Sequence, residues 1–221
     1  MNPAQTLPIR EALRLGWKHT LGNLRPLTYL GLLNVQLSVA QQTALASAPG
    51  QSARPLLALS LQLFQTGVWL LYVRWALALC DGRPLIGLAD PTLLRGLPAF
   101  TATALLYGLI VGFGLVLLVV PGIVWGTRFM FATMLVVDRA CDPWTALRES
   151  ARLTHGVKAR LLGFALVRLA LNALGASLMG LGLIITLPMT FVAKAHLLRH
   201  LQAQTQRVRP ASTPLPSPTP V

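Results

Sequence analysis

The stretch from Val119 to Leu166 constrains the fold more than any other part of the chain. An apolar run ends in the turn Pro121-Gly122, and a second apolar segment at 123–137 carries one arginine, Arg128. A short basic amphipathic segment at 143–155 then leads into another apolar run. This order is typical of a chain that leaves a bilayer, lies on its surface and enters it again. The stretch therefore predicts a polytopic membrane protein.

Composition supports the same interpretation. Hydrophobic residues make up 54% of the chain and charged residues 11%, whereas a soluble domain carries about 25% charged residues. The mean hydropathy is +0.60. The net charge of +13 could indicate a nucleic-acid partner, but the basic residues fall between apolar runs and form no single basic patch. We therefore expect membrane lipid as the partner and no nucleic acid.

We predict an all-α polytopic membrane protein with six transmembrane helices, paired as three hairpins. About 20 residues are needed to cross the hydrocarbon of a bilayer. The six-helix domain covers residues 1–209, and its predicted spans are 26–46, 56–80, 98–120, 122–137, 161–179 and 181–198. Interfacial amphipathic helices are expected at 7–22 and 143–155. A Pro/Ser/Thr-rich tail at 210–221 is expected to be disordered, because it holds no core-forming run.

The distribution of charge predicts the topology. Most of the 19 Lys and Arg residues lie before the first predicted span, in two of the connections and after the last span. All six acidic residues fall on the same side. Because Lys and Arg are enriched in cytoplasmic loops, both termini are expected in the cytoplasm.

The sequence also contains an internal repeat. When residues 12–14 (ALR) are placed over 146–148 (ALR), Thr20 meets Thr154 and Leu27 meets Leu161. A fainter copy starts at residue 92. Each copy consists of a surface helix, a span and a returning span, which favours three hairpins in a pseudo-threefold bundle.

Four basic residues lie inside the predicted spans. A charge in a span costs ~2.5–3.5 kcal/mol on insertion scales, and no acidic residue lies in any span to neutralise it. One interpretation is that these side chains snorkel to the interface or contact backbone carbonyls. The other is that they bind an anion such as a phospholipid phosphate. The candidates are Arg74, Arg128, Arg168 and Lys194.

The position of each candidate within its span separates the two interpretations. Arg74 and Lys194 lie near the cytoplasmic end, where snorkelling is expected. Arg128 and Arg168 lie deeper, and Asn172 is one turn from Arg168. Arg128 and Arg168 therefore give an alternative function, a small transporter or channel-like subunit with an anion path lined by both.

The two interfacial helices present tryptophan beside basic residues, which suits the membrane surface. They form a predicted platform for lipid headgroups or a membrane-protein partner, made of Arg14, Trp17, Trp144, Arg148 and Arg152. The alternatives are that the first helix packs on the protein as an ordinary cytoplasmic helix and that the second only orients the neighbouring spans. The second helix also has clear local signals, with Asp142 as N-cap, Pro143 at the first helical position and a Glu149–Arg152 pair.

Nothing in the sequence indicates catalysis. The four histidines lack HExxH spacing, and neither GxSxG nor a phosphate-binding Gly-rich loop is present. Cys80 and Cys141 belong to no CxxC motif. We therefore expect no enzymatic activity, no metal and no cofactor.

One family resemblance covers residues 115–170. It rests on the apolar "VVPGI", the pair Arg128-Phe129, an apolar run ending in "VVD", and "ALRESARLTHG" before the next span. The pattern resembles bacterial membrane proteins of the domain-of-unknown-function 975 type and, equally, the membrane domain found beside glycerophosphoryl diester phosphodiesterases. The catalytic domain of the latter has no counterpart here. The resemblance implies a six-helix protein of the bacterial inner membrane, associated with lipid and without enzymatic activity.

Overall fold

The computed structural model describes residues 8–47, 53–85, 87, 90–117, 119–177 and 182–208. All regular secondary structure in these residues is α-helical, which confirms the predicted all-α fold. The predicted tail at 210–221 lies outside the described residues. The helices are α1 (Ile9–Gly22), α2 (Leu24–Ser47), α3 (Ala53–Asp81), α4 (Pro91–Leu117), α5 (Val119–Arg128), α6 (Ala132–Arg139), α7 (Pro143–Leu153), α8 (Lys158–Ser177) and α9 (Leu183–Val208).

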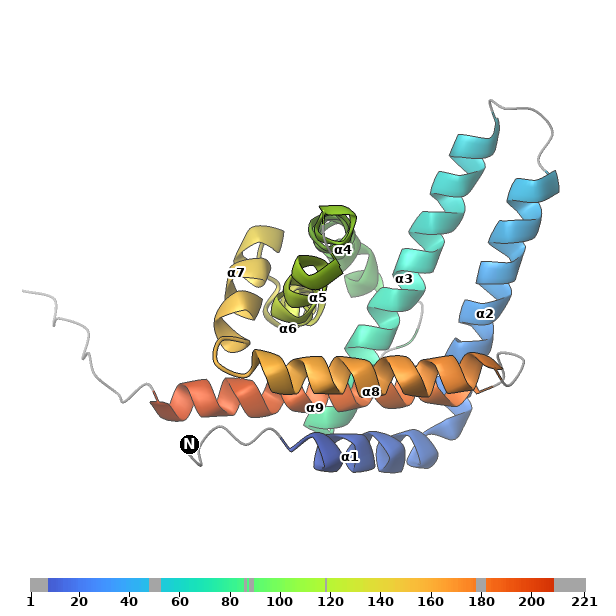
Figure 1. Ribbon diagram of the computed structural model, residues 1–221. Coiled ribbons are helices and arrows are strands. Elements are labelled where there is room, and N and C mark those ends of the chain that lie inside the picture. Colours follow the sequence, from blue (N-terminus) through green and yellow to red (C-terminus); the bar gives the residue numbers. More distant parts are fainter. Residues whose placement is uncertain are drawn as a thin grey trace, which may run out of the picture.

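Consecutive long helices pack in pairs, and the pairs point in different directions (Figure 1). α2 packs on α3 and the two rise together, whereas α8 packs on α9 and both lie across the molecule beside α1. α4 packs on α5, and in this view both are seen close to end-on. The pairs meet at the end of α3, where α6 and α9 also contact it.

The core lies around α6 and α9. Side chains from the two helices and from the turn before α6 are completely buried, among them Phe131, Met134, Leu135, Leu197 and Leu198. By contrast, α4 and α8 expose many leucines on their outer faces, including Leu105, Leu109 and Leu169. The apolar surface of this protein is therefore divided between an inner core and an outer shell of helices.

The sequence repeat corresponds to a ring of helix contacts. α7 packs on α6, α1 packs on α9, and the first turns of α4 pack on α3. The first helix of each copy thus lies on the returning helix of the copy before it, and α1 on α9 closes the ring. Burial agrees at the aligned positions, since Thr20 and Thr154 are 1% and 0% exposed and Leu27 and Leu161 are 2% and 0% exposed.

The prediction of six apolar spans is not supported. Within the described residues, three helices are long and apolar enough to cross a membrane: Pro55–Asp81, Pro91–Leu117 and Lys158–Ser177. The predicted span 26–46 is diluted by Asn34 and three glutamines. The predicted span 122–137 is broken between α5 and α6. The predicted span 181–198 falls largely on α9, which carries Lys194 and two histidines. Three apolar helices suggest a membrane protein.

Candidate functional site

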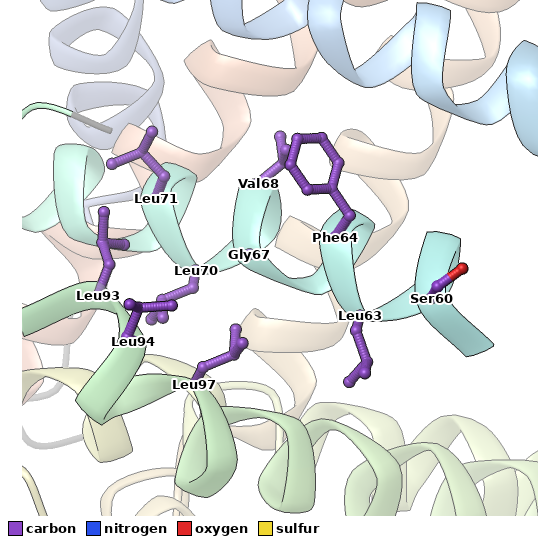
Figure 2. Close-up of a pocket in the computed structure, with 10 residues that line it drawn as sticks. All are labelled: Ser60, Leu63, Phe64, Gly67, Val68, Leu70, Leu71, Leu93, Leu94 and Leu97. Atoms are coloured by element: carbon purple, nitrogen blue, oxygen red, sulfur yellow. The ribbon is translucent and has the colours of Figure 1, made fainter. Parts of the chain in front are cut away.

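An apolar groove lies between α3 and α4 (Figure 2). Leu63 and Leu70 of α3 point toward Leu94 and Leu97 of α4. The groove has a volume of about 350 Å³, and its only polar side chain is Ser60 at one end. It is thus a site for an apolar group and contains nothing that could act on one chemically.

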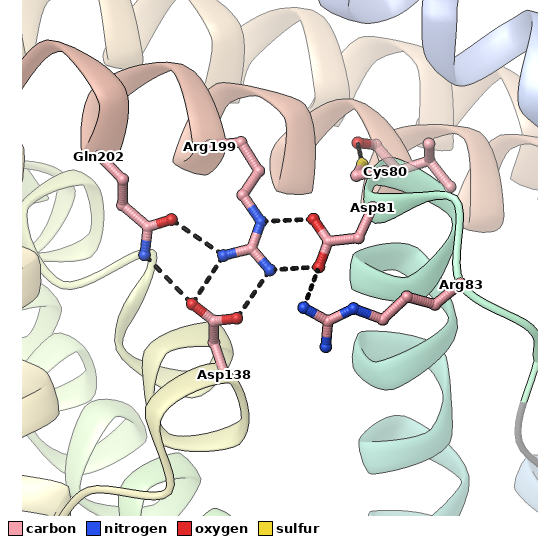
Figure 3. Close-up of polar contacts among 7 residues, drawn as sticks. Cys80, Asp81, Arg83, Asp138, Arg199 and Gln202 are labelled. Atoms are coloured by element: carbon pink, nitrogen blue, oxygen red, sulfur yellow. Dashed lines mark hydrogen bonds and ion pairs between the residues drawn. The ribbon is translucent and has the colours of Figure 1, made fainter.

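A second site is an ion cluster where the ends of α3, α6 and α9 meet, formed by Asp81, Asp138, Arg199 and Gln202 and here called the Arg199 cluster (Figure 3). The Arg199 guanidinium donates two hydrogen bonds to each carboxylate, at 2.9 and 2.7 Å to Asp81 and at 2.7 and 2.7 Å to Asp138. Gln202 donates to Asp138 at 3.2 Å and accepts from Arg199 at 3.0 Å. The planar guanidinium suits such two-pronged contacts. The cluster therefore fastens three helices together.

Burial and hydrogen bonding act in opposite directions on Asp138. Burial disfavours its charged form, but hydrogen bonds from Arg199 and Gln202 favour it, and the pKa of Asp138 is lowered from its ordinary value of 3.8. The hydrogen bonds that Arg199 donates to Asp138 and Asp81 raise the pKa of Arg199. No sequence pattern linked the members of the cluster beyond the predicted placement of all three charged residues on one side of a membrane, because Asp81 and Arg199 are far apart in the chain.

The cluster predicts acid sensitivity. Because the pKa of Asp138 is lower in the folded state, its contribution to stability is complete above the ordinary pKa and is lost as pH falls through the folded pKa. We expect the thermal midpoint in detergent to drop as pH falls below about 4. In Asp138→Asn, the midpoint should be lower at neutral pH and should change less with acidification. Equal acid sensitivity of the two proteins would contradict this.

The third site is the break between α5 and α6, where side chains of α7 and of the residue after it hydrogen-bond to the backbone. The Arg128 carbonyl accepts a hydrogen bond from Ser150 Oγ at 3.0 Å, and Thr154 Oγ1 lies 3.1 Å from the same oxygen. The Phe131 N–H donates to Ser150 Oγ at 3.2 Å. Two backbone groups freed by the break thus find partners in a buried setting, where unpaired groups are costly. The inner face of this helix was predicted from the sequence as Leu147, Ser150, Ala151 and Thr154; all but the half-buried Ala151 are fully buried.

Loss of this hydroxyl should weaken the fold. Ser150→Ala leaves the Phe131 N–H without its acceptor, and we expect a loss of about 1–3 kcal/mol in the free energy of unfolding. Ser38→Ala is the matched control, because within the described residues Ser38 donates its hydrogen bond to the Asn34 carbonyl of its own helix. Thermal unfolding in detergent measures both, and equal midpoints would contradict the role given to Ser150.

The predicted basic candidates do not form one site. Arg74 donates to Thr92 Oγ1 at 2.6 Å and to the Thr92 carbonyl at 2.7 Å, so it lies at the start of α4. Arg128 is exposed, with its guanidinium 5.6 Å from the centre of the Phe129 ring. Its backbone carbonyl, and not its charge, makes the contact with α7.

Arg168 of α8 and Lys194 of α9 lie close enough for the charge of Arg168 to act on Lys194. Arg168 is half-buried, and its charge acts on Lys194 and on Tyr107. Lys194 is 6% exposed, with Nζ 6.0 Å from the centre of the Phe191 ring, so the prediction that it snorkels out is wrong. The Asn172 side-chain oxygen, Oδ1, is buried without a hydrogen-bond partner in the described residues, so Arg168 does not donate a hydrogen bond to it there.

No acidic side chain compensates the Arg168–Lys194 pair within the described residues. Asp81 and Asp138 bind Arg199, and Glu149 binds Arg139 at 3.0 Å and Arg152 at 2.9 Å. The remaining three acidic residues lie on α1, before α4 and at the start of α7: Glu11, Asp90 and Asp142. Two cations therefore share a partly dehydrated space without a counter-ion from these residues, and an anion fits it electrostatically.

The predicted platform residues lie on the surface. Trp17 and Trp144 are 47% and 57% exposed, and the Arg148 guanidinium lies 5.4 Å from the centre of the Trp144 ring. Arg14 is also exposed, and the predicted Glu149–Arg152 pair is present. Asp142 occupies the N-cap position of α7, but its side chain makes no capping hydrogen bond. α1 also packs on α9 through Ala12, Gly16 and Thr20, with Trp17 turned outward.

Within the described residues, no group of three or more His, Cys, Asp or Glu side chains could hold a metal ion. Comparison with known proteins gave no matching family model, no similar curated protein and no similar solved structure.

Proposed function

We propose that this chain is a non-enzymatic integral protein of the bacterial inner membrane that binds anionic phospholipid, with both termini in the cytoplasm. Its resemblance to the domain-of-unknown-function 975 type and to the phosphodiesterase-associated membrane domain is part of this proposal. A membrane-protein partner that docks on the platform of Trp17 and Trp144 remains compatible with it. The observation that carries the proposal is the uncompensated Arg168–Lys194 pair.

We infer further that six segments enter the bilayer, as three hairpins. The three helices apolar enough to span expose large apolar side chains on their outer faces, and so does α2, at Tyr29, Leu32 and Val39. Neighbouring helices bury the side chains of α6 and α9, so these two helices need not be uniformly apolar to lie within a bilayer. The ends of α3, α6 and α9 meet in the Arg199 cluster, as expected if the second, fourth and sixth segments all end on one side.

An anion at Arg168 and Lys194 would be the phosphate of a lipid, because the pair lies among helices with apolar outer faces. The hydrocarbon setting strengthens the attraction between a cation and a phosphate. Arg and Lys inside membrane segments usually face a protein interior or a cavity and mark a functional site. Here the two cations come from different helices of one pair, so a phosphate between them would also hold α8 and α9 together.

Native mass spectrometry of the detergent-purified protein tests this function. We expect wild type to retain anionic phospholipid, and Arg168→Leu with Lys194→Met to lose at least tenfold in the occupancy of one of the lipids that wild type retains. Arg128→Leu is the matched control, because Arg128 is an exposed cation in another apolar segment. If wild type retains no anionic lipid, or if the double variant retains as much as wild type, the proposed function is wrong.

The alternative of an anion path lined by Arg128 and Arg168 has no specific structural support. Arg128 is exposed beside Phe129, whereas Arg168 is half-buried beside Lys194. Anion uptake into liposomes that is lost in Arg128→Leu would favour transport.

A further inference from the structure

The groove between α3 and α4 is open on its outer side and closed at its floor. Leu70, Leu71 and Val68 are buried at 0–2% exposure. Two rim side chains, Phe64 and Leu94, are 56% and 73% exposed. Figure 2 shows leucines from both helices directed into the space between them. The groove is long, narrow and apolar, and such a surface is stable only when something apolar covers it.

Glycine makes part of this space. A Cβ at Gly67 would meet only Leu97 Cδ1, at 4.0 Å, so the groove continues over the α3 backbone at this position. Further along α3, a Cβ at Gly96 of α4 would lie 3.0 Å from an Arg74 guanidinium nitrogen and 3.8 Å from Leu70. The helices are therefore close at the Arg74 end and leave room at the Gly67 end.

The close end of the groove is positively charged. Arg74 lies one turn beyond Leu70 and Leu71, and its hydrogen bonds to Thr92 fix the guanidinium over the first turn of α4. Arg95 is exposed and follows Leu94 directly. Asp90, the nearby acidic residue, accepts a hydrogen bond from the Thr92 N–H. The Arg74 guanidinium thus lies beside the lining residue Leu70, near Gly96, and Arg95 is the residue next to the lining residue Leu94. Two cations near this end of the groove are complementary to the headgroup of an anionic lipid.

We propose that this groove binds one acyl chain of an anionic phospholipid, whose phosphate lies against Arg74 and Arg95. The inference rests on the proposed function and adds a second, separate lipid site, since Arg168 and Lys194 lie on α8 and α9. The phosphate accepts hydrogen bonds from the guanidinium N–H groups not used by Thr92. The acyl chain covers the leucines of both helices. Lipid at this site fills the space between α3 and α4 at the Gly67 end, where the two helices are further apart than at the Arg74 end.

Photo-crosslinking tests the site. A phosphatidylglycerol with a diazirine in its acyl chain is added to the full-length protein in detergent, and labelled peptides are identified by mass spectrometry. We expect labelling within 60–71 and 93–97 that is competed by unlabelled phosphatidylglycerol at least fivefold better than by phosphatidylcholine. Gly67→Leu should fill the groove and lower this labelling at least fivefold, while Arg95→Gln should remove the preference for the anionic lipid.

Matched variants separate the site from general lipid contact. Gly108→Leu makes the same change at an exposed glycine of α4 with open space around it, and Lys18→Gln removes an equally exposed cation from α1. Both should label as wild type does. Labelling that is unchanged in Gly67→Leu, or that phosphatidylcholine competes equally well, overturns the groove. The proposed function fails separately, if the number of retained anionic lipids is the same in wild type and in Arg168→Leu with Lys194→Met.

Discussion

Arg199→Leu should lower the free energy of unfolding by about 3 kcal/mol or more. The substitution removes all five guanidinium hydrogen bonds and leaves the Asp81 and Asp138 carboxylates facing each other with side chains only 17% and 14% exposed. Two carboxylates that share a site repel one another, and one must be protonated or move. Because the cluster joins α3, α6 and α9, the loss should separate the three helices at this point. Thermal unfolding in detergent measures the effect.

Three further variants show whether charge or shape is responsible. Arg199→Lys keeps the positive charge but cannot make the two-pronged contacts, so its midpoint should lie between wild type and Arg199→Leu. Adding Asp138→Asn to Arg199→Leu should recover part of the loss, because one of the two repelling charges is gone. Arg83→Leu is the matched control. Arg83 also pairs with Asp81, but its side chain is 73% exposed and the contact is longer, at 3.4 Å, so the thermal midpoint should change little. An Arg199→Leu midpoint equal to that of Arg83→Leu would contradict the role of the cluster.

Lys194→Met should stabilise the lipid-free protein and weaken its response to anionic lipid. Lys194 is buried, and burial together with the charge of Arg168 disfavours its charged form until an anion arrives, so the amine opposes folding in the lipid-free protein. A ligand at 100 times its Kd stabilises the folded state by about 2.7 kcal/mol, and the gain requires the binding site. Added phosphatidylglycerol should therefore stabilise wild type by more than it stabilises Lys194→Met.

Lys194→Met is expected to raise the thermal midpoint without lipid and to reduce the rise that lipid causes. These two changes of opposite sign separate a role in binding from a role in folding. A residue that only supports the fold would lower the thermal midpoint on substitution, with or without lipid. Arg128→Leu, at an exposed position, should behave as wild type in both conditions. If Lys194→Met is less stable than wild type without lipid and still responds fully to phosphatidylglycerol, Lys194 has no part in anion binding.

Local signals made part of the fold predictable. The first interfacial helix was predicted to end at residue 22, and α1 ends at Gly22 with Asn23 as its C-cap. Asp142 and Pro143 marked the start of α7 correctly. The aligned repeat positions Thr20 and Thr154 are buried alike. Each of these features depends on residues within a few positions of one another, which a sequence displays directly.

Features that depend on neighbours distant in sequence were missed. The chain contains no signal that Ser150 would reach the Arg128 carbonyl, and the apolar run 122–137 therefore gave no sign of its break at 129–131. Lys194 was expected to snorkel because it lies near a helix end, but helices from elsewhere in the chain cover it. Hydrophobicity alone also cannot separate a helix that faces lipid from one that is shielded within the protein, and this is why six apolar spans were expected.

Thiol accessibility in intact spheroplasts tests the proposed membrane arrangement most directly. In a cysteine-free background, single cysteines are placed at the hairpin ends (Ala46→Cys, Ser177→Cys) and at the opposite ends (Gly87→Cys, His155→Cys), all exposed positions. We predict that a membrane-impermeant maleimide labels the first two in intact spheroplasts and the last two only after permeabilisation. Labelling of Gly87→Cys or His155→Cys in intact spheroplasts, or equal labelling of all four, would contradict a membrane protein whose polar helix ends meet on the cytoplasmic side.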